Sequence, residues 1–302
     1  SSRRALLGWT WVAGFVGYFG AVGWLCRVGE YSGLTQPWGW VAGAVGGLTL
    51  GAYMGLYVAL FAWLVKRLAP RAGGVAHAFG VAAMWTFCEW LRSWVITGFP
   101  WVALGYTQWN ALPMARIASF SGVAGVTFIL ATANVGIAQC LTRFKAGERA
   151  SLWRPLAAPA ALVLVALAAG RVTTIRPTPD ALSVRVAIVP GNIPQDERWD
   201  RPSLAKNLRT YIGLLETAAE GQPDLIVMPE TAVPYPYLTT EDRALFADVA
   251  VRMGVPVLFG APRVEADAAT ARRVVYNGAL VLRPDGTFGA PYDKQHLVPF
   301  GE

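Results

Sequence analysis

The sequence predicts a membrane-embedded bundle of α-helices followed by an α/β domain. Hydrophobic residues make up 54% of the 302 residues and charged residues only 15%, with a mean hydropathy of +0.39, which is typical of a membrane protein. The long apolar stretches all lie within residues 1–170. After Arg171 charged residues become common, and short apolar runs alternate with amphipathic stretches. We therefore expect a membrane domain over residues 1–170, a linker over 171–182 and a second domain over 183–302.

Five stretches are apolar and long enough to cross a bilayer core of ~30 Å, which needs about 20 helical residues. They are residues 5–26, 38–65, 75–96, 122–141 and 156–170. The last stretch is short and contains Pro159, so it is barely long enough to cross the bilayer and is the weakest of the five predicted spans. Residues 112–120 predict a short interfacial helix.

Basic residues predict the orientation of these spans. They precede the first span, follow the second and lie between the fourth and fifth: Arg3, Arg4, Lys66, Arg67, Arg71, Arg143, Lys145, Arg149 and Arg154. By the positive-inside bias these segments are cytoplasmic, and five crossings place the second domain on the outer side. The same clustering explains the net charge of +7 without a nucleic-acid partner.

The second domain has a β-α-β-α-β order with further strand pairing near its end. Strands are predicted over residues 184–189, 225–228, 256–259 and 274–282, and helices over 203–219 and 240–253. Glu230 follows the buried strand 225–228 directly. Ligands bind beyond the carboxyl ends of such strands, so Glu230 is a candidate general base. The ordinary alternative is a glutamate that begins a loop.

Two features of the membrane domain have both a structural and a functional interpretation. Glu89 and Arg92 share a helical face in the third span, where an ion pair at the interface is favoured over a functional polar site. Residues 98–106 combine Gly, Pro and aromatic residues on the outer side. They form either an ordinary aromatic belt or a surface that guides a lipid acyl chain.

The three cysteines, Cys26, Cys88 and Cys140, lie inside apolar stretches and are interpreted as packing residues. Neither a disulfide framework nor a metal cluster is indicated. We expect no metal and no organic cofactor.

Four segments resemble one family. VPGNIPQDERWD (189–200), LIVMPETAVP (225–234) and YDKQHLVPFGE (292–302) resemble the nitrilase-type domain of the apolipoprotein N-acyltransferases, within the carbon-nitrogen hydrolase superfamily. TGFPWVALGYTQ (97–108) is similar to that family's membrane motif. The resemblance implies a layered αββα domain, which is incomplete at its C-terminus in this sequence.

The resemblance also implies the site residues. Glu230 corresponds to the general base, Lys294 to the catalytic lysine and Glu302 to a second active-site glutamate. Trp199 and Trp101 correspond to substrate-contacting tryptophans. The implied reaction passes an acyl chain from a phospholipid, through a cysteine thioester, to the N-terminal amine of a diacylglyceryl apolipoprotein at the outer face of the bacterial inner membrane.

The family's nucleophilic cysteine is expected beyond residue 302, and further helices are expected before residue 1. We therefore interpret the sequence as a fragment that is inactive alone. Two alternatives remain open. One is a cysteine-less, membrane-anchored nitrilase-like module that binds lipid or lipoprotein, and the other is a membrane-anchored nitrilase-like amidase.

Overall fold

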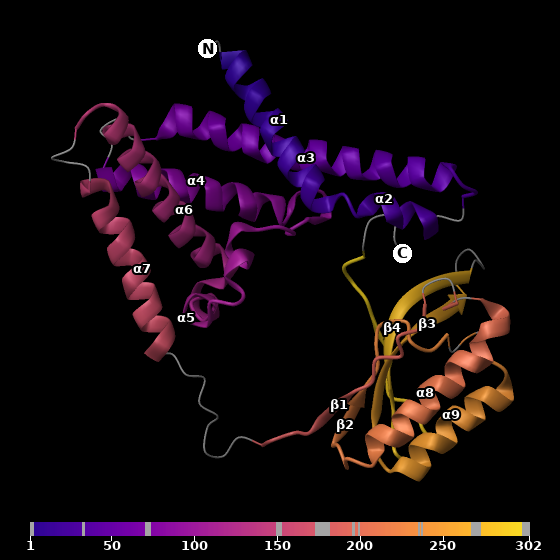
Figure 1. Cartoon of the computed structure of the whole chain (residues 1–302). Helices are drawn as coiled ribbons and strands as arrows, with labels where there is room; N and C mark the ends of the chain where they lie inside the picture. The colour runs from indigo at the N-terminus through magenta and orange to yellow at the C-terminus, as the bar shows by residue number, and fades with distance from the viewer. Residues whose placement is uncertain are drawn as a thin grey trace. The chain divides into compact units, whose positions relative to one another are not determined.

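The computed structural model describes residues 3–31, 34–69, 74–148, 153–172, 182–194, 197–198, 200–234, 236, 238–266 and 273–297 (Figure 1). The chain divides into two compact units, Ser1–Arg176 and Pro177–Glu302. We refer to them as the membrane unit and the α/β unit.

The described residues of the membrane unit form helices joined by turns and irregular segments, with no strand among them. Its α-helices are α1 (Arg3–Val22), α2 (Leu25–Val28), α3 (Trp38–Leu68), α4 (Gly74–Arg92), α5 (Leu112–Ala115), α6 (Ala118–Lys145) and α7 (Arg154–Val172). Short 3₁₀ turns lie at Gly29–Tyr31 (η1), Val95–Thr97 (η2) and Leu104–Gln108 (η3). Helix α1 packs along α3, α4 against α6, and α6 against α7.

Small residues bring α1 and α3 together. A Cβ atom on Gly14 of α1 would lie 2.7 Å from Cγ2 of Val58 in α3, and one on Gly55 of α3 would lie 3.0 Å from the Phe15 backbone nitrogen. A larger residue at either position would push α1 and α3 apart or force the neighbouring atoms to shift. Glycines at helix interfaces are typical of membrane bundles, where close packing replaces the hydrophobic driving force.

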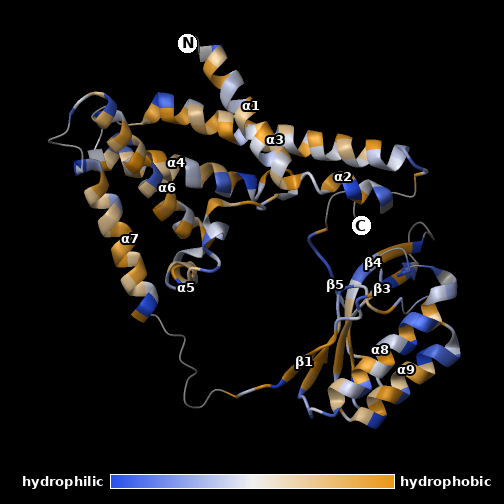
Figure 2. Ribbon diagram, in the orientation of Figure 1, coloured by the Kyte–Doolittle hydropathy of each residue, from blue (hydrophilic) through white to orange (hydrophobic). Residues whose placement is uncertain are grey.

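Four of the described helices, rather than five, are long and apolar enough to span a membrane: α1, α3, α6 and α7. The predicted third span does not meet this criterion. It ends at Arg92 instead of continuing to residue 96, and the chain then forms the separate turn η2, where Ile96 and Thr97 have φ angles of 52° and 65°. The short fifth span is among the four. Figure 2 shows α7 apolar over most of its length, with hydrophilic residues near its end.

The α/β unit contains one sheet of five strands. They are β1 (Val186–Ile188), β2 (Leu225–Val227), β3 (Val257–Ala266), β4 (Arg273–Leu282) and β5 (Tyr292–Asp293), in the spatial order β1-β2-β3-β4-β5. Helix α8 (Leu204–Ala219) connects β1 to β2, and α9 (Thr240–Met253) connects β2 to β3. Strands β1, β2 and β3 are parallel, whereas β4 and β5 are antiparallel to their neighbours. The predicted β-α-β-α-β order and the later antiparallel pairing are confirmed.

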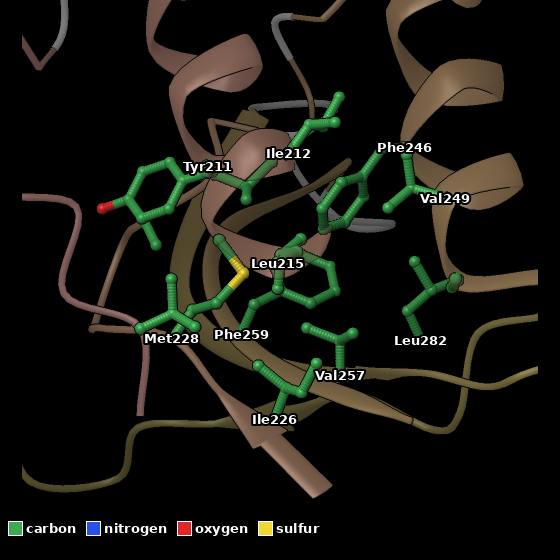
Figure 3. Packing of buried hydrophobic residues seen from close by; sticks show 14 of the residues in the cluster. Tyr211, Ile212, Leu215, Ile226, Met228, Phe246, Val249, Val257, Phe259 and Leu282 are labelled. Atoms are coloured by element: carbon green, nitrogen blue, oxygen red, sulfur yellow. The ribbon is translucent and has the colours of Figure 1, made fainter. Parts of the chain in front are cut away.

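The two helices pack on one face of this sheet. Along β3 the alternate residues Val257, Phe259 and Ala261 are fully buried, as expected for a strand with one face on a core. Leu215 of α8 and Phe246 of α9 are also fully buried, and the Phe246 and Phe259 rings meet edge to face at 5.1 Å (Figure 3). This core fixes the strands whose ends carry the candidate site.

Candidate functional site

Glu230 lies in a tight turn that β3 supports. The turn begins after β2, and Gly260 of β3 brackets it through two backbone bonds. Gly260 N donates to Pro229 O at 3.2 Å, and Val233 N donates to Gly260 O at 3.1 Å. The approach is so close that a Cβ atom on Gly260 would lie 2.7 Å from the Glu230 Cα. The absence of a side chain at residue 260 therefore allows the carboxylate to sit beside the sheet.

The residue after Glu230 has an unusual backbone. Thr231 has a φ angle of 49°, in the left-handed region that β-branched residues rarely adopt. Such a conformation costs on the order of 1–3 kcal/mol and persists only where the surroundings impose it. The two hydrogen bonds with Gly260 hold the backbone on either side of Thr231, so β3 fixes the turn from which the Glu230 side chain projects.

Lys294 reaches Glu230 from another part of the chain. It follows β5, and its backbone N–H donates to Asn277 O of β4 at 2.9 Å. Its Nζ lies 3.1 Å from Glu230 Oε1, and the two side chains are 31% and 62% exposed. Residues 64 positions apart in the sequence thus form an ion pair that remains open to solvent.

Asn277 completes the cluster. Its Nδ2 donates to Glu230 Oε1 at 2.6 Å, while its carbonyl oxygen accepts the Lys294 backbone bond. Both side-chain bonds therefore end on the same oxygen of Glu230. Because the carboxylate is exposed, its other oxygen, Oε2, can face an incoming group and accept a proton from it.

A second ion pair holds β5 in place next to Lys294. Arg263 of β3 binds both carboxylate oxygens of Asp293, with Nε donating to Oδ1 at 2.9 Å, and its guanidinium lies 4.6 Å from the centre of the Tyr276 ring. Hydrogen bonding from Arg263 holds the pKa of Asp293 below its ordinary value. The strand that precedes Lys294 is thus tied to the strand that supports Glu230.

The other predicted site residues are not part of this cluster. Trp199 and Glu302 lie outside the described residues. Trp101 belongs to the membrane unit, where it stacks on Phe99 at 5.6 Å and on Trp24 at 5.4 Å between ring centroids, and it is 52% exposed. Within the described ranges, His, Cys, Asp and Glu side chains form no group of three that could hold a metal ion.

Both units match known families. Residues 1–136 match the family model of the apolipoprotein N-acyltransferase N-terminal domain, and residues 185–302 match that of the carbon-nitrogen hydrolases. The chain belongs to the apolipoprotein N-acyltransferase family. The resemblance seen in its sequence motifs is therefore confirmed.

Curated members of the family are similar along nearly the whole chain. The apolipoprotein N-acyltransferase of Geobacter metallireducens is 34% identical over 96% of this chain, and that of Chromobacterium violaceum is 33% identical over 99%. In both cases the chain spans only 55% of the relative's length. Among solved structures, a carbon-nitrogen hydrolase from Helicobacter pylori G27 is 20% identical, with 37% of this chain and 40% of that chain covered and a TM-score of 0.28.

Sequence reasoning missed two contributors to the cluster, Asn277 and Gly260. Both stand in runs that otherwise consist of apolar strand residues, VVYNGALVL and VLFGAP. A polar residue or a glycine inside a strand often marks a close approach of backbone or ligand. That signal was available, but it does not say which partner approaches.

Proposed function

We propose that the chain provides the general base and the oxyanion-stabilising lysine of a phospholipid:apolipoprotein N-acyltransferase. The observation that carries this proposal is the 3.1 Å contact between Lys294 Nζ and Glu230 Oε1 at the end of β2. A base and an ammonium this close can act on the two ends of one reacting group, since the base takes a proton while the cation stabilises charge on the carbonyl oxygen.

The nucleophile in this proposal is a cysteine thiol supplied by a residue that is not in this sequence. Cys26, Cys88 and Cys140 belong to helices α2, α4 and α6 of the membrane unit. The family resemblance instead assigns the thiol to the α/β domain. The chain of 302 residues is therefore expected to be inactive alone.

In the first step Glu230 accepts the thiol proton, and the sulfur attacks an ester carbonyl carbon of a phospholipid. Lys294 stabilises the negative charge that develops on the carbonyl oxygen. The carbon–sulfur bond forms and the ester carbon–oxygen bond breaks. The departing lysophospholipid alkoxide takes the proton from Glu230, leaving an acyl thioester on the cysteine.

In the second step the α-amine of a diacylglyceryl apolipoprotein attacks the thioester carbon. Glu230 accepts the amine proton, the carbon–nitrogen bond forms and the carbon–sulfur bond breaks. The released thiolate recovers a proton from Glu230, which restores the starting state. Neither step consumes a metal ion or an organic cofactor.

The test uses the complete gene product, purified in detergent with a phospholipid donor and a diacylglyceryl lipopeptide acceptor. We expect Glu230→Gln and Lys294→Ala each to lower the rate of lipopeptide N-acylation about 10²- to 10⁴-fold, the range typical for lost acid–base or electrostatic catalysis. The matched control is Arg252→Ala in α9, which removes the exposed Arg252–Glu216 ion pair and should leave the rate nearly unchanged.

Two results contradict the proposal. Near-normal N-acylation by Glu230→Gln or Lys294→Ala shows that these side chains do not carry the reaction. Release of free fatty acid without transfer to the lipopeptide amine identifies water as the acceptor and favours the amidase interpretation.

A further inference from the structure

The membrane unit contains a carboxylate that the proposed chemistry does not use, that of Glu89 in α4. Its Oε1 accepts hydrogen bonds from Trp85 Nε1 at 3.0 Å and from Leu104 N at 2.8 Å. Its Oε2 accepts a bond from Thr127 Oγ1 at 2.8 Å. The three donors come from α4, η3 and α6, so one side chain joins three separate elements.

This arrangement corrects the ion pair expected from the sequence. Glu89 binds three neutral donors, and Arg92, one turn later, is 1% exposed with its guanidinium 4.9 Å from the centre of the Tyr18 ring. Arg92 is thus buried within the helices and does not extend toward a membrane surface. Carboxylates at membrane depth are costly and persist where several donors satisfy them.

The donors on η3 belong to the aromatic segment, which we define as residues 97–108. Leu104 N binds Glu89, and the next amide, Gly105 N, binds Thr127 Oγ1 at 3.0 Å. The start of the segment is held by Phe99 N, which donates to Arg92 O at 2.9 Å. The aromatic segment is therefore held on both sides of Trp101: by α4 before it, and by α4 and α6 after it.

Close packing gives this attachment a single geometry. A Cβ atom on Gly105 would lie 2.7 Å from the Val123 carbonyl oxygen and 3.1 Å from Thr127 Oγ1. Between the two attachment points Trp101 stacks on Phe99 at an interplanar angle of 18°. The Trp101 ring also stacks on Trp24. The result is an aromatic surface that is exposed yet held at both ends.

We propose that Glu89 is the positioning residue of the aromatic segment, and that it fixes Phe99 and Trp101 as a preformed apolar surface for a phospholipid acyl chain. The identity of the acyl chain rests on the proposed function, whereas the positioning rests on the hydrogen bonds of Glu89. A preformed surface avoids the entropy of ordering two aromatic side chains when lipid binds.

The chain is to be labelled with 5-fluorotryptophan and embedded in phosphatidylethanolamine–phosphatidylglycerol nanodiscs. Because the chain has 13 tryptophans, the Trp101 and Trp40 fluorine resonances are assigned by their loss in Trp101→Phe and Trp40→Phe. Glu89→Ala should shift and broaden the Trp101 resonance. Glu89→Gln, which keeps an acceptor for Trp85 and Leu104, should leave it close to wild type.

The chain offers a matched control at Glu30, whose Oε1 accepts a bond from Trp40 Nε1 at 2.9 Å. Glu30→Ala breaks the same kind of glutamate–tryptophan bond and should move the Trp40 resonance alone. If Glu89→Ala does not fold, Thr127→Val removes the hydroxyl that joins Glu89 to Gly105 and should move Trp101 in the same direction. An unmoved Trp101 resonance in the folded variants, or equal damage by Gln and Ala, overturns the positioning role.

Photolabelling in the same nanodiscs tests the acyl chain. A phospholipid that carries a diazirine in its acyl chain should label residues 97–108 of wild type and of Glu89→Gln. Labelling of Glu89→Ala should fall about fivefold or more, because three hydrogen bonds are lost and a factor of about five corresponds to each one. Equal labelling of all variants overturns the inference. It leaves the chemistry of Glu230 and Lys294 untouched, because photolabelling measures contact with the acyl chain and does not depend on acyl transfer.

Discussion

At the scale of single residues, Gly260 decides whether β3 can support the turn that carries Glu230. A methyl group there would meet the Thr231 nitrogen at 2.4 Å and the Glu230 Cα at 2.7 Å, and both are backbone atoms that cannot rotate away. We expect Gly260→Ala to destabilise the α/β unit by about 1–3 kcal/mol, as is typical of overpacking. Hydrogen exchange of the amides in β2 and β3, measured by mass spectrometry, will show the loss of protection.

The control for this substitution is Gly213→Ala in α8. A Cβ atom there meets nothing within 4 Å, so alanine should stabilise the helix by roughly 0.5–1 kcal/mol. If Gly260→Ala exchanges like wild type in β2 and β3, the close approach of β3 is not what holds the Glu230 turn.

The Asp293–Arg263 pair predicts a pH dependence close to Lys294. Hydrogen bonding to Arg263 lowers the folded-state pKa of Asp293, so its contribution to stability is present above the unfolded pKa of about 3.9. That contribution is lost as the pH falls through the lower, folded-state value. We expect residues 292–297 to exchange faster as the pH is lowered below about 4, after correction for intrinsic rates. Asp293→Asn should exchange fast at every pH and lose this dependence.

The sequence predicts a site residue best when that residue directly follows a strand, because the end of the strand fixes its place in the fold. Glu230 follows a buried strand, so its position at the edge of the sheet was expected, and in the structure its carboxylate contacts Lys294. Asn277 was missed because its role depends on which strands pair. Its side chain reaches Glu230 only because β4 lies beside β3, with Asn277 opposite Pro262.

At the scale of elements, α8 and α9 stabilise the sheet through the side chains that face it. Leu215 is fully buried in this core, whereas its neighbour Leu214 is 37% exposed. Leu215→Ala should destabilise the α/β unit by about 2–5 kcal/mol, and Leu214→Ala by clearly less, because only the first leaves a cavity. Urea-dependent hydrogen exchange of α8 and β2 in the full chain will measure both, and equal effects would contradict this packing.

The ends of helices and strands were predicted correctly where the apolar periodicity continues along the element. The prediction was wrong where glycine or proline interrupts that periodicity. The strand predicted over 256–259 runs to Ala266, because Gly260, Ala261 and Pro262 resemble a turn but pair with β4 throughout. For the third span the error is in the other direction, because the predicted helix is longer than the observed one. Its apolar residues continue past Arg92, but the chain leaves the helix there and Phe99 N returns to the Arg92 carbonyl.

At the scale of the whole molecule, the orientation in the membrane depends on whether α4 crosses. Helix α4 has 19 residues, as many as α7, but it is not among the helices apolar enough to count as spans, and its packing against α6 is that of a bundle member. The basic residues decide between the two cases. Lys66 and Arg67 end α3, and Arg143 and Lys145 end α6. Both ends lie on the cytoplasmic side only if α4 returns the chain across the bilayer between them.

Three reporter insertions test this orientation. We propose that α4 crosses and that the α/β unit lies on the outer side. Alkaline phosphatase should then be inactive after Glu148, between α6 and α7, and active after Asn110 and after Val172. If α4 does not cross, α6 begins in the cytoplasm and ends outside, so all three activities reverse. The reversed pattern would place Arg143 and Lys145 outside, against the charge bias, and would put Glu230 and Lys294 on the cytoplasmic side instead of the proposed outer side.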